Sequence, residues 1–233
     1  MVSKRNNFER IFNKYKTIGK GNVRLTQSSL FLLNDIAATR SQYDFVVLEN
    51  DNSVAVKPKE IRLNQNDEFI VTSLGLYLVG RWGDVPAPGT TDTRPITLFT
   101  TSPFEMDTAN LQLNHFYDGK FRVAVNNIVY TEKWDLRRHQ KTSITQMEGF
   151  LAGTSQATMP SVELKDDGMF NLSPLLTLSG AKKNELTLTL GNSIAPGTAI
   201  TFKDNKGGSA NVTITEIALE MRGLLAQNAA KFQ

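Results

Sequence analysis

Residues 111–134 read LQLNHFYDGKFRVAVNNIVYTEKW and contain the clearest indication of a β fold. Apolar runs lie on both sides of Asn126-Asn127, and Asp118-Gly119 separates the first of these runs from a third one before it. These dipeptides favour tight turns, because Asn, Asp and Gly tolerate positive φ. The stretch therefore predicts a three-stranded meander over Leu111–Phe116, Lys120–Val125 and Ile128–Trp134.

Similar β patterns extend in both directions from this meander. Leucines and threonines alternate in Glu185–Leu190, which is typical of a strand with one buried face. Residues 204–210 predict a hairpin loop that brings Ile200 and Phe202 opposite Val212 and Ile214. The remaining predicted strands are Val23–Leu33, Tyr43–Leu48, Ser53–Lys57, Glu60–Leu63, Glu68–Val79, Pro95–Thr100, Val162–Leu164, Leu175–Leu178, Thr198–Lys203 and Asn211–Met221. Many short strands separated by turns predict a mainly β, antiparallel sandwich or barrel.

The composition is that of a globular chain without cysteine. Of its 233 residues, 40% are hydrophobic and 21% are charged, so a large core is expected without help from disulfides. The absence of cysteine excludes thiolate metal sites and cysteine nucleophiles. We find no apolar run long enough to cross a bilayer and no secretory signal, and we expect synthesis in the cytoplasm.

The first 22 residues form a basic arm. Between Met1 and Arg24 there are seven basic residues and one acidic residue, a charge of +6 on a chain whose net charge is +3. The spacing of Phe8, Ile11, Phe12 and Tyr15 predicts an amphipathic helix over residues 4–17 that ends before Gly19. The basic side chains of this arm are Lys4, Arg5, Arg10, Lys14, Lys16 and Lys20.

Three interpretations of this arm follow from its residues. The helix packs its apolar face on its own core, or it docks against a neighbouring subunit. In the third interpretation it contacts an anionic surface, which is either nucleic acid phosphate or a membrane interface.

An internal similarity bears on the domain organisation. Residues 61–69 and 162–170 place apolar side chains in the same order, which suggests two related β units at 23–140 and 141–233. The alternative is one continuous β domain over 23–233.

Catalytic and metal-binding patterns are not found. His115 lies in a predicted strand and His139 in a charged, solvated segment, which disfavours a zinc site. Asp166-Asp167 and the pair Glu105 and Asp107 offer carboxylates, but Asp-Asp-Gly is ordinary turn chemistry. We therefore expect no enzyme activity, no catalytic residues, no cofactor and no metal.

Two long excursions, residues 82–94 and 149–161, are candidate contact loops. Trp82, Pro86 and Pro88 lie in the first of them. An exposed Trp82 would provide a stacking platform for a sugar, which supports an alternative function as a β-sandwich module that binds carbohydrate or a host surface.

Several segments together resemble bacteriophage jelly-roll capsid proteins. They are the basic arm at 4–20, the short strands after Val23, the segment LNHFYDGKFRV at 113–123 and the closing strand VTITEIALEMRG at 212–223. The resemblance implies a jelly roll with a short N-terminal helix, either single or two in tandem as in double jelly-roll capsid proteins.

The resemblance also implies a function. It implies a structural protein of the virion, a major or auxiliary capsid subunit that forms trimers or higher oligomers through symmetric contacts. Its partners would be copies of itself, other virion proteins, and an internal membrane or the genome at the N-terminal arm.

Overall fold

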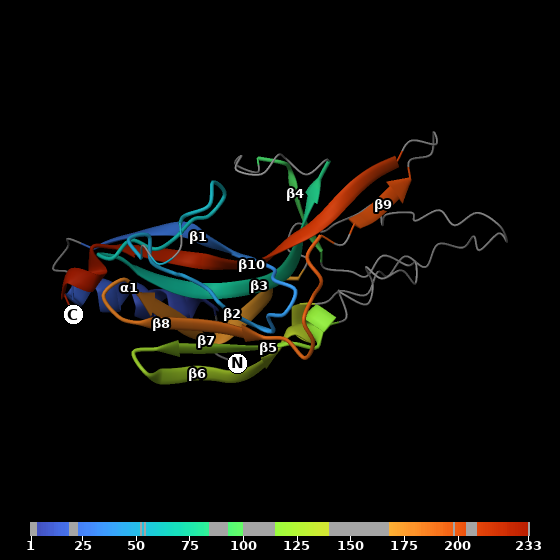
Figure 1. The fold of residues 1–233 in the computed structure, drawn as a ribbon. Helices are drawn as coiled ribbons and strands as arrows, with labels where there is room; N and C mark the ends of the chain where they lie inside the picture. Colours follow the sequence, from blue (N-terminus) through green and yellow to red (C-terminus); the bar gives the residue numbers. More distant parts are fainter. Residues whose placement is uncertain are drawn as a thin grey trace.

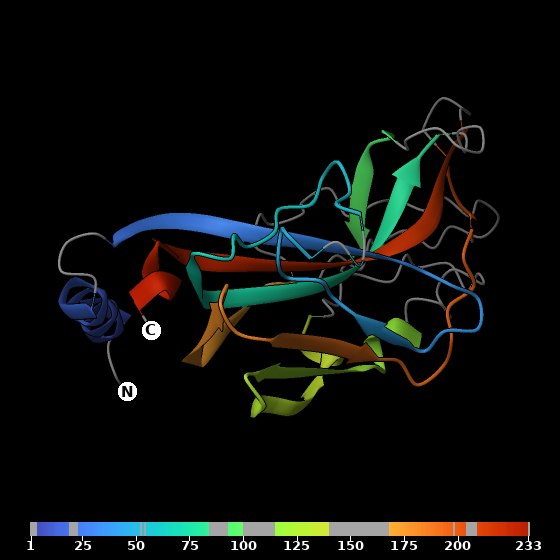
Figure 2. The same ribbon diagram turned by 60° about the vertical axis from the view of Figure 1, so that its left-hand side comes forward.

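The computed structural model describes residues 4–18, 23–51, 53, 55–83, 93–99, 115–139, 168–197, 199–203 and 209–232. The fold is mainly β, with two antiparallel sheets that lie face to face (Figures 1 and 2). The helical elements are α1 (Lys4–Ile18) and two short 3-10 helices, η1 (Leu136–His139) and η2 (Ala229–Phe232). The N-terminal helix agrees loosely with the expected one and extends one residue further.

The larger sheet contains six strands. They are β1 (Arg24–Asp35), β3 (Glu68–Trp82), β4 (Ile96–Phe99), β7 (Phe170–Ser179), β9 (Ala199–Lys203) and β10 (Ser209–Gln227). β10 and β3 form its centre, and each changes partners along its length. β10 pairs with β9 over residues 209–213 and with β1 over 216–227, whereas β3 pairs with β7 and then with β4. The ends of β3 and β10, together with β4 and β9, extend beyond the smaller sheet (Figures 1 and 2).

The smaller sheet contains four strands in the order β2 (Gln42–Asp44), β8 (Asn184–Thr189), β5 (Lys120–Val125) and β6 (Ile128–Asp135). Asn126 and Asn127, at φ values of 51° and 63°, form the predicted tight turn between β5 and β6. Leu186 and Leu188 are buried while Thr189 is exposed, which confirms the predicted one-sided burial of β8. Each sheet joins strands from both sides of residue 140.

The main core lies between the two sheets. Leucines of β1 and β3 meet Phe121 of β5 and Leu188 of β8 in this cluster, and β10 contributes Ile217 and Leu219. The central strand β3 is buried on both faces, because smaller apolar clusters cover the outer face of its sheet. One of these clusters includes Tyr15 of α1, and the other includes Tyr77 and Val79 beside β4.

Close packing also explains a glycine in β10. A Cβ atom on Gly223 would lie 1.9 Å from the carbonyl oxygen of Ile70 on β3, at a point where the register between the two strands shifts. Only glycine permits this approach of two backbones.

Some predicted strands are wrong. The meander has two strands instead of three, because His115–Tyr117 forms a helical turn and β8, distant in sequence, pairs with β5 instead. Residues 111–114 lie outside the described residues. Residues 45–47 and 55–57 form no strand, and the predicted strand at 60–63 is reduced to isolated bridges at Ile61 and Leu63. In the β9–β10 hairpin Phe202 pairs with Ala210 and Ile200 pairs with Val212, a register shifted by two residues from the predicted one, in which Phe202 is opposite Val212 and Ile200 is opposite Ile214.

Candidate functional site

The N-terminal helix is anchored to the larger sheet by Tyr15. The Tyr15 side chain is buried against Ile70 and Ala226, and its hydroxyl donates to Oε2 of Glu68 at 2.5 Å. Burial and then the neighbouring carboxylate raise the pKa of Tyr15, so the hydroxyl keeps the proton that this bond requires. Glu68 is also buried, so the hydrogen bond from Tyr15 helps to satisfy a carboxylate in the protein interior.

The face of α1 that points away from the sheet is basic. Arg10, Lys14 and Lys16 are exposed, and the Lys14 ammonium lies 5.0 Å from the centre of the Tyr15 ring. The predicted apolar stripe is divided. Ile11 is partly buried on the sheet, but Phe12 is 57% exposed. This arrangement presents cations and one aromatic ring to whatever lies outside the helix.

The side chains of the remaining predicted arm residues are not described by the structure. Lys4, Arg5 and Phe8 belong to the helix by their backbone, while their side chains are outside the described part. Lys20 lies outside the described residues altogether.

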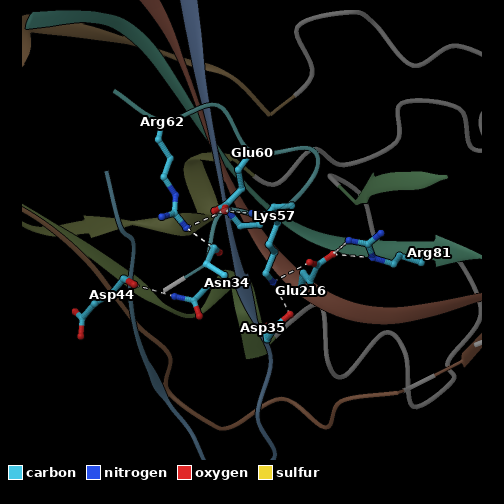
Figure 3. Close-up of polar contacts among 10 residues, drawn as sticks. Asn34, Asp35, Asp44, Lys57, Glu60, Arg62, Arg81 and Glu216 are labelled. Atoms are coloured by element: carbon cyan, nitrogen blue, oxygen red, sulfur yellow. Dashed lines mark hydrogen bonds and ion pairs between the residues drawn. The ribbon is translucent and has the colours of Figure 1, made fainter. Parts of the chain in front are cut away.

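A charged cluster is buried where β10 changes partners from β9 to β1. Glu216 of β10 accepts hydrogen bonds from Nε of Arg81 at 2.8 Å and from Nζ of Lys57 at 2.9 Å (Figure 3). Lys57 also pairs with Asp35 at the end of β1. Only 3% of Glu216 and 5% of Arg81 are exposed, so the cluster links three strands and a loop through charges inside the protein.

A second set of polar contacts holds the same loop against β1 (Figure 3). Oε1 of Glu60 accepts from the backbone N–H of Leu33, and its Oε2 accepts from the backbone N–H of Lys57 and from Arg62. Glu60 therefore acts as a capping acceptor for the edge of β1. Sequence reasoning missed both clusters.

The imidazole of His139 is buried, contrary to the solvated position predicted for it. Its Nδ1 lies 2.7 Å from the carbonyl oxygen of Gly168, and its Nε2 accepts from the indole N–H of Trp134 at 2.9 Å. The ring is therefore neutral, with its proton on Nδ1. Burial, supported by the positive charge of Arg138, lowers the pKa of His139 below its ordinary value. His115, predicted in a strand, lies in the helical turn, where its Nδ1 is 3.2 Å from the side-chain amide of Asn192.

Trp82 is the last residue of β3, and its partly buried ring packs against the main core. It is therefore not the exposed loop residue that the sugar-platform interpretation requires. Pro86 and Pro88 lie outside the described residues, as do the 149–161 loop and the carboxylates at 105, 107, 166 and 167.

One groove of about 460 Å³ is lined by residues 44–48, by Asp51 and by residues 183–187 around the start of β8. Two carboxylates that line this groove already have hydrogen-bond or ion-pair partners. Asp44 accepts from the Thr187 hydroxyl, and Glu185 pairs with Lys183 and Arg122. Within the described ranges no group of three or more metal-ligating side chains is found, and no helix there is long and apolar enough to span a membrane.

Comparison with known proteins finds no matching family model, no similar curated protein and no similar solved structure.

Proposed function

We propose that this protein is a structural subunit of a virus particle, a capsid or capsid-associated protein built on a single jelly roll. The observation that carries the proposal is the nesting of four strand pairs. Among β1, β2, β3, β5, β6, β7, β8 and β10, the first strand pairs with the last and the second with the seventh. The third pairs with the sixth, and the fourth with the fifth.

Nested pairing is what results when one long hairpin of eight strands is rolled into a two-sheet sandwich. Such double-sheet rolls occur in viral capsid and lectin domains. In this proposal β4 and β9 are additions to the ends of β3 and β10, and the other described strands all belong to one roll. The step from the roll to a capsid is an analogy between folds.

The surface supports a role in assembly. Ile128, Val129 and Tyr130 are large apolar side chains on β6, and between 45% and 62% of each is exposed. Adjacent exposed apolar residues of this kind mark surfaces that other proteins cover. Copies of the chain, and other virion proteins, would bury such surfaces in a symmetric shell.

The arm supports contact with the particle interior. Because Tyr15 and Ile11 are used to dock α1 on the sheet, Phe12 is the one apolar side chain described as exposed on the helix. The exposed Arg10, Lys14 and Lys16 then favour phosphate groups over insertion into hydrocarbon. In this proposal the arm faces the genome or the headgroups of an internal membrane.

The carbohydrate-binding alternative is not favoured. It depends on an exposed Trp82, and that ring packs against the core.

The proposal is tested by imaging the full chain by electron microscopy, with and without single-stranded DNA at low salt. We expect regular oligomers or closed particles. The variant R10E/K14E/K16E should keep the oligomer but lose salt-dependent DNA binding, because these side chains are exposed and Tyr15 and Ile11 make the apolar contacts that dock α1 on the sheet. Irregular aggregates or isolated monomers under all conditions would overturn the proposal.

A further inference from the structure

The N-terminal half of β1 has a free edge. Phe31 exchanges backbone hydrogen bonds with Ile61, on the side of β1 that faces away from β10. Strand geometry then places the N–H and C=O groups of Leu25, Gln27 and Ser29 on this same outward side. In the described part of the chain these groups have no recorded hydrogen-bond partner, and β1 is the outermost strand of its sheet (Figures 1 and 2).

This edge lacks the features that block strand pairing. Residues 25–29 contain no charge and no proline, and β1 pairs with β10 over twelve residues without a register shift. Proteins ordinarily protect their sheet edges with charges, proline, bulges or very short strands. An unprotected, regular edge is a template for another strand.

The other edges described here are protected. β6 carries Glu132 and Lys133 and has two register shifts against β5. β7 contains Pro174, and β2, β4 and β9 are three to five residues long. The contrast singles out β1 as the edge kept open for pairing.

We infer that residues 24–30 of β1 pair antiparallel with the same residues of a second copy, about a two-fold axis at Gln27. In this register Leu25 faces Ser29 of the second copy, and Gln27 faces Gln27. The outward groups of all three residues are then satisfied in both copies, and no like charges meet. The contact deepens the proposed function and rests on it, because it specifies one surface through which copies assemble.

The neighbouring loop fits this register. Ile61 is 51% exposed and closes the edge beside Phe31. In this register Phe31 would lie opposite Val23 of the second copy, but its outward backbone groups already bond to Ile61. The pairing between copies therefore ends before Phe31, and Ile61 lies next to the end of the added strand without blocking it. A stable interface needs about 1,000 Å² of buried surface, more than a seven-residue strand pair supplies. We therefore expect this contact to act together with others in an assembly.

A cysteine placed at the axis tests the inference, because the chain contains no cysteine of its own. In Gln27→Cys the two Cα atoms of a hydrogen-bonded pair would lie about 5.5 Å apart, within disulfide reach. The matched control is Thr26→Cys, whose two copies would lie about 8 Å apart. Oxidised glutathione should link most of the Gln27→Cys protein into dimers and little of the control. Equal cross-linking of both variants would overturn the inference.

Charge variants give an independent test. Gln27 is exposed, so Gln27→Lys and Gln27→Glu should both fold. Each variant alone places like charges at the axis and should weaken self-association at least tenfold. A mixture of the two should restore it, because lysine then faces glutamate. Restoration is specific to a contact between two copies and is not expected for a different partner.

The outcomes separate this inference from the proposed function. If the wild type assembles and neither the cross-link nor the charge variants have an effect, the β1 contact is wrong and the structural role stands. A protein that cross-links through residue 27 but forms no larger assembly would uphold the contact and contradict the capsid role. Monomers without any cross-link would contradict both.

Discussion

Two buried polar clusters hold this sandwich together by different means. In the Glu216 cluster, formal charges on a strand, its neighbour and a loop meet inside the protein. In the His139 cluster, a neutral ring joins Trp134 of β6 to Gly168, just before β7. The first cluster depends on complementary charge. The second depends on the absence of charge, because Nε2 of His139 must accept a hydrogen bond.

The two clusters therefore differ in the free energy that is lost when one member is removed. Removing one member of a buried charged cluster leaves an uncompensated ion in the interior, whereas a lost neutral hydrogen bond leaves one unsatisfied atom. Substitution of Glu216 should therefore cause the larger loss of folding free energy. The stability contributed by the His139 cluster should decrease in mild acid.

The largest expected effect is that of Glu216→Gln. It removes the charge that Arg81 and Lys57 share, and we expect it to lower the free energy of unfolding by about 3–5 kcal/mol. Urea denaturation measures this change. Glu220→Gln on the same strand is the control, because 36% of the side chain of its partner Arg222 is exposed, and the substitution should cost at most about 1 kcal/mol. Equal losses in both variants would contradict the role assigned to burial.

Trp134→Phe should have the next largest effect. It removes the indole N–H and leaves Nε2 of the buried His139 without a donor, at a cost of about 1–3 kcal/mol. The control is Tyr130→Phe at an exposed site on the same strand, which should change stability by less than about 0.5 kcal/mol. If thermal unfolding shows no difference between the two variants, the Trp134–His139 bond contributes nothing.

Acid should weaken the His139 cluster specifically. Because burial lowers the pKa of His139 in the folded state, the unfolded chain binds a proton first as the pH falls. Stability should be complete above the ordinary pKa of about 6.5 and decline below it, by about 1.4 kcal/mol for each unit of the pKa difference. Denaturation at several pH values measures the decline. The chain has two histidines, so NMR titration can assign the low pKa, and a pKa of 6.5 or above for His139 would contradict the account.

The smallest effect is expected for Asp35→Asn. Asp35 pairs with Lys57 in the Glu216 cluster, but 75% of its side chain is exposed. Solvent screens this pair, so the loss should be below about 1 kcal/mol in urea denaturation. A loss as large as that of Glu216→Gln would show that position in the cluster matters more than burial.

Local sequence patterns predicted much of the sheet structure. The Asn126-Asn127 turn and the alternation in β8 depend on neighbouring residues, and both appear as expected. The errors arise where residues distant in the sequence determine which strands pair. Leu111–Phe116 was predicted as the third strand of a meander because no local pattern shows that β8 pairs with β5.

The buried clusters could be predicted only in part. The carboxylate of Glu216, between Ile214 and Ile217, indicates a buried charge that needs a partner. Its partners Lys57 and Arg81 are 159 and 135 residues away, and no spacing in the sequence connects them. His139 was misplaced for a related reason, since its charged neighbours Arg137 and Arg138 are exposed while the imidazole itself turns inward.

The mass of the protein in solution shows whether this chain assembles with copies of itself. Light scattering of the full chain over a range of concentrations measures that mass without a label. The account predicts a trimer or larger assembly whose proportion rises with concentration. A strict monomer of 25.9 kDa at every concentration would contradict it.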